Sequence, residues 1–112
     1  GCSASRHNDA NDYRAWIAIE TNASGVKVEA YCFNETSQDA VLRYELKAKK
    51  TGIAGKAQTS QSGSVEVPAG QQKRLSRLDL SVSAQDRYQI DLKVYKDVEL
   101  VAEDSISYPQ QQ

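Results

Sequence analysis

Short segments in which apolar and polar residues alternate strictly are the feature that most constrains the fold of this chain. The alternation is clearest in residues 26–34 and 87–95. The side expected to face the core carries Val26, Val28, Ala30 and Cys32 in the first segment and Tyr88, Ile90, Leu92 and Val94 in the second. Because successive side chains of a β-strand point to opposite faces of a sheet, a period of two predicts strands with one buried face.

Turn-forming residues divide the rest of the chain into further segments of this kind. Residues 40–50 contain good helix formers, but their apolar residues recur at every second position, which favours a strand. Leu75 is out of phase with the leucines that follow it, which predicts a bulge near Ser76. We expect strands at residues 14–21, 26–34, 40–50, 56–62, 64–67, 73–82, 87–95 and 98–107.

This pattern predicts an all-β fold class, namely an immunoglobulin-like antiparallel β-sandwich of about seven strands. A β-barrel is the alternative. The chain has 112 residues, which is enough to bury one hydrophobic core. We expect a flexible N-terminal leader at residues 1–12, the sandwich domain at residues 13–109 and a C-terminal tail at residues 110–112.

Charge and hydropathy exclude several classes of partner. The formal net charge is −1, and acidic and basic residues are interspersed along the chain. No overall electrostatic field would therefore attract nucleic acid or an anionic membrane, which leaves only local patches of charge. No apolar run approaches the roughly 20 residues that a membrane-spanning helix requires.

Residues for catalysis or metal binding do not occur in a functional pattern. A serine or cysteine nucleophile needs a base such as histidine within hydrogen-bond reach, and the single histidine, His7, lies in the expected leader. The sequence contains no Cys-x-x-Cys, no His-Glu-x-x-His and no Asp-x-Asp calcium loop. We therefore expect a protein that is not an enzyme and that uses no cofactor or metal.

The two cysteines, Cys2 and Cys32, allow three interpretations. The sequence around Cys2 resembles the cleavage site of a bacterial lipoprotein, in which case Cys2 would carry lipid and tether the protein to a membrane. Cys2 could instead form a disulfide with Cys32. In the third interpretation both are free thiols, and Cys32 is buried as a small hydrophobic residue.

Residues 52–80 contain an ordered set of short motifs: Gly-x-x-Gly, Gln-Thr-x-Gln, a Pro-Ala turn and Leu-x-x-Leu-x-Leu, with Asp-Arg before the next strand. In this order the motifs resemble those of the curli-assembly family, CsgC and CsgH, and the resemblance covers roughly residues 41–109. The CsgC branch carries a Cys-x-Cys pair near the positions of Leu42 and Tyr44, which this chain lacks. The CsgH branch lacks this pair as well, so the resemblance favours that branch.

The resemblance implies the same β-sandwich and a location in the periplasm. Members of this family keep curli subunits, which are secreted amyloid-forming proteins, from polymerising before export. By this resemblance we expect a monomeric, chaperone-like amyloid inhibitor whose partners are CsgA-like curli subunits. The alternative, from a different functional class, is a structural β-sandwich module of a surface fibre or adhesin.

Two surfaces are candidates for binding such a client. In an immunoglobulin-like sandwich, residues 43–49 and 87–95 are neighbours, so their outward side chains would form one face. The second candidate is an exposed sheet edge formed by Gln58, Thr59 and Gln61. The simpler interpretations are a solvated sheet face and an edge protected against aggregation. The face would carry Arg43, Glu45, Lys47, Lys49, Arg87, Gln89, Asp91, Lys93 and Tyr95.

Overall fold

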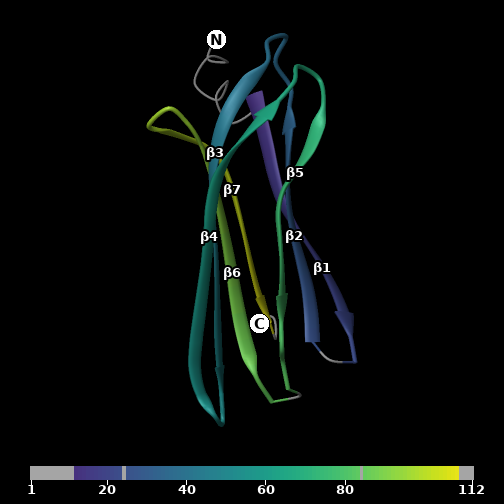
Figure 1. Ribbon diagram of the computed structural model, residues 1–112, viewed down its shortest axis with the longest axis vertical. Helices are drawn as coiled ribbons and strands as arrows, with labels where there is room; N and C mark the ends of the chain where they lie inside the picture. The colour runs from purple at the N-terminus through teal and green to yellow at the C-terminus, as the bar shows by residue number, and fades with distance from the viewer. Residues whose placement is uncertain (1–11, 24, 84, 109–112) are drawn as a thin grey trace, which may run out of the picture.

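Seven β-strands build the described part of the chain. The structure is a computed structural model that describes residues 12–23, 25–83 and 85–108. The strands form two antiparallel sheets that pack face to face (Figure 1). The predicted all-β sandwich is confirmed, and the two separate sheets exclude a closed barrel. The strands are β1 (Tyr13–Asn22), β2 (Gly25–Asn34), β3 (Ala40–Gly52), β4 (Gly55–Val67), β5 (Gln72–Leu80), β6 (Arg87–Lys96) and β7 (Glu99–Tyr108).

The order of the strands decides which surfaces are open. The three-stranded sheet has the order β1-β2-β5, and the four-stranded sheet has the order β4-β3-β6-β7. In the larger sheet, β3 and β6 are therefore central, and β4 and β7 are the edges. Because β3 and β6 are paired, the predicted adjacency of residues 43–49 and 87–95 is confirmed.

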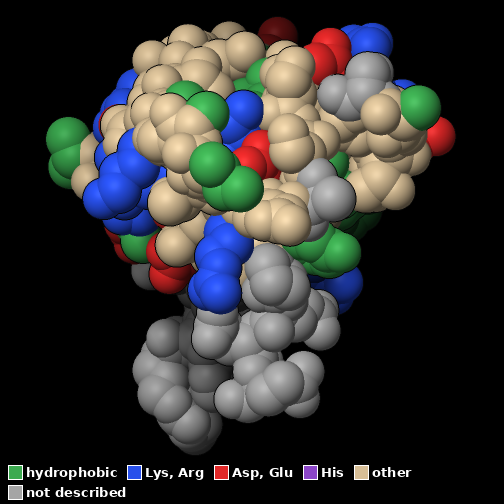
Figure 2. Space-filling model, turned by 90° about the horizontal axis from the view of Figure 1, so that it is seen from below, with side chains coloured by type: hydrophobic (Ala, Val, Ile, Leu, Met, Phe, Trp, Pro, Cys, Tyr) green, Lys and Arg blue, Asp and Glu red, His purple; other side chains and the backbone are tan. Residues whose placement is uncertain are grey.

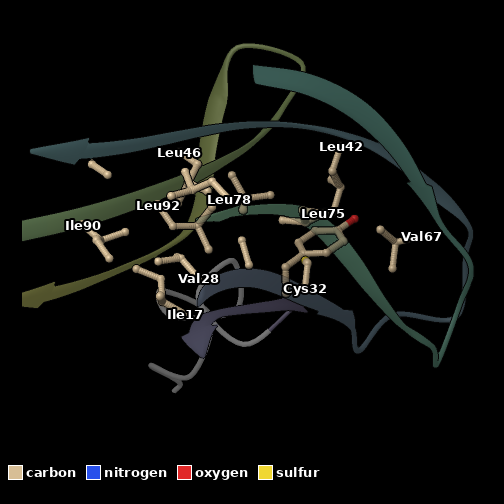
Figure 3. Close-up of a cluster of buried hydrophobic side chains, with 14 of the residues drawn as sticks. Ile17, Val28, Cys32, Leu42, Leu46, Val67, Leu75, Leu78, Ile90 and Leu92 are labelled. Atoms are coloured by element: carbon tan, nitrogen blue, oxygen red, sulfur yellow. The ribbon is translucent and has the colours of Figure 1, made fainter. Parts of the chain in front are cut away.

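Apolar side chains from both sheets fill the space between the layers (Figure 3). Leu42, Leu46 and Leu92 of the larger sheet and Val28 of the smaller one are almost completely inaccessible to solvent. Each fully buried leucine contributes about 2 kcal/mol of hydrophobic stabilisation. On β3 the even-numbered residues face the core, so the prediction of a strand over residues 40–50 is confirmed.

A β-bulge interrupts the pairing of β5 with β2 near the predicted position. Ala30 lies opposite Ser76, and the next residue, Tyr31, lies opposite Arg74, so Leu75 is the extra residue. A bulge allows one additional residue on one strand of an antiparallel pair. Leu75 is buried as a result, although its position in the sequence is out of phase.

Residues 55–67 form one continuous strand, which corrects the prediction of two strands separated at Gly63. A glycine inside a strand weakens it and often marks an interruption. In the structure Gly63 lies opposite Tyr44, and a Cβ atom at Gly63 would be 3.1 Å from the Tyr44 hydroxyl. The Tyr44 ring covers the glycine backbone, which allows β4 to continue.

Polar contacts join the two sheets at both of their open sides. On one side, the Asp104 carboxylate of β7 accepts a hydrogen bond from the backbone N–H of Ile17 in β1, with an N to O distance of 2.9 Å. On the other side, the Gln61 side chain of β4 accepts a hydrogen bond from the Ser76 hydroxyl of β5. Gln61 also donates to the Arg77 carbonyl at 3.4 Å. Edge strands of different sheets are thereby held together.

Asn34, at the end of β2, is a polar residue that is completely buried. Its Nδ2 atom donates to the carbonyl oxygens of Gln38 at 2.8 Å and Val67 at 2.9 Å. Its Oδ1 atom accepts hydrogen bonds from the backbone N–H of Thr36 at 2.8 Å and from the Thr36 hydroxyl at 2.7 Å. The side chain therefore uses both of its donors and its acceptor oxygen, and it fixes the β2–β3 loop to the end of β4.

Candidate interaction surfaces

The outer side of β3 and β6 brings together the charged and polar side chains predicted for one face. They point to solvent because the residues between them along each strand are buried in the core. Five are cationic and two are carboxylates, so the surface is positive. Binding of a client to it remains a prediction. We call this surface the basic face and define it by Arg43, Glu45, Lys47, Lys49, Arg87, Gln89, Asp91, Lys93 and Tyr95.

One end of the basic face is neutralised by its own contacts. The Nη1 atom of Arg43 lies 2.9 Å from Oε2 of Glu45. The central carbon of the same guanidinium lies 4.4 Å from the centroid of the Tyr95 ring, and a cation in this position is attracted by the ring's quadrupole. Arg43 and Tyr95 are therefore already engaged with each other, and Arg43 is the least available cation of the face.

The remaining cations of the basic face have no such partner. Asp91 lies opposite Lys47 across the strands, but its carboxylate accepts hydrogen bonds from the Ser105 hydroxyl at 2.8 Å and from Gln89 at 3.3 Å. Neutral donors thus hold the Asp91 carboxylate, which keeps its charge but forms no ion pair with Lys47. Among the described residues, no ion pair is formed by Lys47, Lys49, Arg87 or Lys93.

The positive surface extends onto β4, which the sequence alone did not predict. Pairing of β4 with β3 sets Gln58 opposite Lys49 and Lys56 opposite Thr51. Lys56 therefore lies on the same side of the sheet as the basic face. The turn at residues 53–54 is the signal that could have placed it, because a two-residue turn fixes the register of a hairpin.

β4 is an edge strand, as predicted, but its three candidate side chains do not all point to the same side of the sheet. Gln58 points to the outer side, whereas Thr59 lies opposite Ala48 and Gln61 lies opposite Leu46, on the side of the core. Gln61 is occupied by its hydrogen bonds to β5. All three residues contribute to the lining of a groove of about 470 Å³ between β4 and β5, which are edge strands of different sheets.

Cys32 is a buried free thiol that points into the core. Burial raises the pKa of the Cys32 thiol to about 11, because the thiolate is poorly solvated in apolar surroundings. This environment is the one expected if Cys32 serves as a small hydrophobic residue. Cys2 and His7 lie outside the described residues, so lipid attachment to Cys2 stays a prediction.

The buried thiol predicts a loss of stability at alkaline pH. The folded-state pKa of about 11 exceeds the ordinary value of 9.0, so the unfolded chain releases its thiol proton first. The free energy of unfolding should therefore be unaffected below about pH 9 and should fall, by at most about 3 kcal/mol, as the pH approaches 11. Urea denaturation of the wild type and of Cys32→Ala measures this effect. The free energy of unfolding of Cys32→Ala should lack this alkaline decrease. If it falls with pH as steeply as that of the wild type, the buried thiol is not the cause.

In residues 12–23, 25–83 and 85–108, no cluster of His, Cys, Asp and Glu side chains is suited to hold a metal ion. The same residues contain no helix with the length and apolar character needed to cross a membrane.

Solved structures with this fold include two proteins from curli systems. The E. coli curli protein CsgC has a TM-score of 0.70 at 20% identity, with 88% of this chain and 99% of that chain covered. The solution structure of R. palustris CsgH has a TM-score of 0.63 at 20% identity, with coverages of 81% and 89%. A Bacteroides uniformis β-glucuronidase has a TM-score of 0.56 at 10% identity, but 86% of this chain covers only 14% of the enzyme. At these identities the likeness concerns the fold, and the enzyme match is no evidence of catalysis.

The sequence itself matches a family model over most of its length. The family model named Tafi-CsgC, described as thin aggregative fimbriae synthesis protein, matches residues 17–104. In contrast, no curated protein matches the chain. The region matched by the family model includes β2 to β6 completely and most of β1 and β7, and it confirms the resemblance to the CsgC and CsgH proteins. The chain therefore belongs to the Tafi-CsgC family of thin aggregative fimbriae synthesis proteins.

Proposed function

We propose that this chain is a periplasmic, chaperone-like inhibitor that keeps curli subunits from polymerising into amyloid before secretion. The observation that carries the proposal is the basic face, on which four exposed cations have no ion-pair partner among the described residues. Membership of a fimbriae synthesis family supports a curli subunit as the client.

The position of the basic face explains how it would bind a client without promoting fibril growth. β3 and β6 are central strands, so their backbone N–H and C=O groups already pair with strands on both sides. A client that meets this face contacts side chains and finds no backbone ladder to extend. Unpaired cations attract acidic segments and raise the rate of encounter without requiring tight binding.

The edge strand β4 supports a second contact with the client. Its first half, residues 55–60, is exposed on both sides of the sheet, and among the described strands β4 pairs only with β3. An extended client segment would add to this edge through backbone hydrogen bonds. The polar side chains and Lys56 of β4 would then discourage addition of further strands, because charged and polar edges oppose aggregation.

The expected result in a thioflavin T assay is a several-fold longer lag phase for a purified curli major subunit when this chain is present at a substoichiometric ratio. Substoichiometric action is expected because nucleation passes through few early oligomers. An unrelated β-sandwich domain of similar net charge is the control, and it should leave the lag unchanged. An unchanged lag with every curli subunit tested would overturn the proposal.

A second measurement, on the chain alone, separates the inhibitor from a structural fibre module. A fibre module should assemble with itself, so the chain alone should gain mass over time in size-exclusion chromatography or light scattering. An inhibitor should remain monomeric under these conditions. Self-assembly of the chain alone, together with an unchanged client lag, would favour the fibre module.

A further inference from the structure

An exposed isoleucine lies at the tip of the longest hairpin. β3 and β4 pair as far as Gly52 and Gly55, so the turn consists of Ile53 and Ala54 alone. The side chain of Ile53 is 87% exposed. This hairpin reaches further than the other loops at its end of the sandwich (Figure 1). An apolar side chain is thus presented at the extremity of the molecule.

Cationic side chains lie close behind this tip. Lys56 and Arg87 both lie opposite Thr51, one on each of the neighbouring strands. Lys49 precedes Thr51 by two residues on the same side of β3, and Lys50, on the other side, donates to a carbonyl of the loop after β5 at 2.6 Å. Seen from this end, blue lysine and arginine side chains lie beside green hydrophobic ones in the left half of the view (Figure 2).

The cations at the tip are not paired with neighbouring carboxylates in the described part of the chain. No ion pair is formed by Lys49, Lys56 or Arg87 among the described residues. Because like charges at adjacent positions of a sheet repel each other, these three cations destabilise one another. Asp86 lies beside Gly52 at this end, but its carboxylate accepts a hydrogen bond from the Ser83 backbone N–H at 2.8 Å. A negatively charged surface would relieve the repulsion.

An aromatic pair stands beside the same cations. Tyr108 is 54% exposed and stacks on Tyr88 with 5.4 Å between the ring centroids. Both residues contribute to the lining of a shallow hollow of about 300 Å³ together with Lys49 and Arg87, although Tyr88 itself is buried and Tyr108 is the exposed member of the pair. Tyrosine at the border between apolar and polar surroundings is typical of residues at membrane interfaces.

The opposite end of the sandwich provides an internal comparison. Val98, in the turn between β6 and β7, is 95% exposed, and its hairpin lies at the other end of the molecule (Figure 1). Its neighbours in the sequence are the acidic residues Asp97 and Glu99. An exposed aliphatic side chain is therefore present at both ends, but Ile53 lies near Lys49, Lys56 and Arg87, whereas Val98 lies between two acidic residues.

We infer that the β3–β4 tip docks on membranes that contain anionic phospholipids. Ile53 enters the interfacial layer, and the lysines with Arg87 contact the lipid phosphates. Peripheral binding of this kind needs two weak signals, an apolar insertion and electrostatic attraction. A convex tip with an apolar end fits a lipid surface, whereas free phosphate requires converging donors in a pocket, and an acidic peptide requires no exposed isoleucine.

The experiment is flotation with vesicles of phosphatidylglycerol and phosphatidylethanolamine, and with vesicles of phosphatidylcholine alone. The chain carries Cys2→Ser, so that no acyl chain contributes. We expect binding to the anionic vesicles, little binding to the neutral ones, and a decrease with added salt. Lys56→Ala should weaken binding about fivefold, since each cation near an anionic surface contributes a factor of this order.

Ile53→Ser is also expected to weaken binding about fivefold, through loss of buried apolar area, whereas the matched control Val98→Ser should leave it unchanged. Absence of binding to anionic vesicles, equal binding to neutral ones, or equal effects of the two serine variants would each overturn the inference. A different result would indicate that the tip contacts the client protein instead of a membrane. In that case the chain would not bind vesicles, and the lag phase of a curli subunit would be shorter with Ile53→Ser than with the wild-type chain. The inference does not depend on client inhibition, which Ile53→Ser should leave intact.

Discussion

Asn34→Ala is expected to lower the free energy of unfolding by about 3 kcal/mol, because it leaves buried polar groups without partners. The wild-type amide donates to the Val67 carbonyl at 2.9 Å and to the Gln38 carbonyl at 2.8 Å. It also accepts two hydrogen bonds from Thr36. Alanine restores none of these contacts, and the site is completely closed to solvent. Urea denaturation followed by circular dichroism measures the loss.

Asn34→Asp separates the hydrogen-bond explanation from a simple loss of packing. Aspartate has nearly the same shape, but at neutral pH the oxygen that replaces Nδ2 would face the carbonyls of Val67 and Gln38 without a proton to donate. The variant should therefore be at least as unstable as Asn34→Ala at pH 7. Near pH 3 the protonated carboxyl regains one donor, so its deficit relative to the wild type should shrink. A loss below about 1 kcal/mol for Asn34→Ala would contradict the role of the network.

The local pattern of the sequence was sufficient to predict strands whose two faces differ in polarity. β2 and β6 were placed within one residue because their alternation is strict, and the extra residue in β5 could be recognised from the phase of Leu75. The prediction for β4 was wrong at Gly63 because the ring that covers this glycine belongs to Tyr44, on another strand. Contacts of this kind depend on cross-strand register, which a local pattern does not contain.

The role of Asn34 could not be predicted from the sequence either, because one of its partners is far away along the chain. An asparagine before a polar segment is typical of a turn, and nothing nearby indicates that its amide reaches Val67, 33 positions later in the chain. Buried polar networks of this type join segments that are far apart in the sequence. They become visible only when the packing of the loops is known.

The basic face was predictable in outline but not in its electrostatics. The period of two, together with the adjacency of β3 and β6, was sufficient to place nine side chains on one surface. The sequence could not indicate that Arg43 is engaged by Glu45 and Tyr95, or that Ser105 of β7 occupies Asp91. These contacts decide which cations remain available to a partner.

Combined substitution of Lys47→Glu, Lys49→Glu and Lys93→Glu is expected to abolish inhibition of curli subunit polymerisation, if the proposed function is correct. The three lysines are exposed and form no ion pair among the described residues, so their replacement should leave the fold intact. Reversal of the charge converts attraction of an acidic client into repulsion, which lowers the association rate by about tenfold or more. The lag phase with the variant should approach that of the client alone.

A matched control distinguishes the basic face from a general effect of net charge. Lys47→Glu with Lys93→Glu changes the charge by the same amount as Lys73→Glu with Lys96→Glu, and the latter pair is exposed and lies outside the basic face. The first double variant should lose most of the inhibition and the second should keep it, at equal stability in urea. Equal loss of inhibition in both double variants would indicate that the net charge of the protein, and not the basic face, attracts the client. Full inhibition by the triple variant would instead leave the edge strand β4 as the surface that contacts the client.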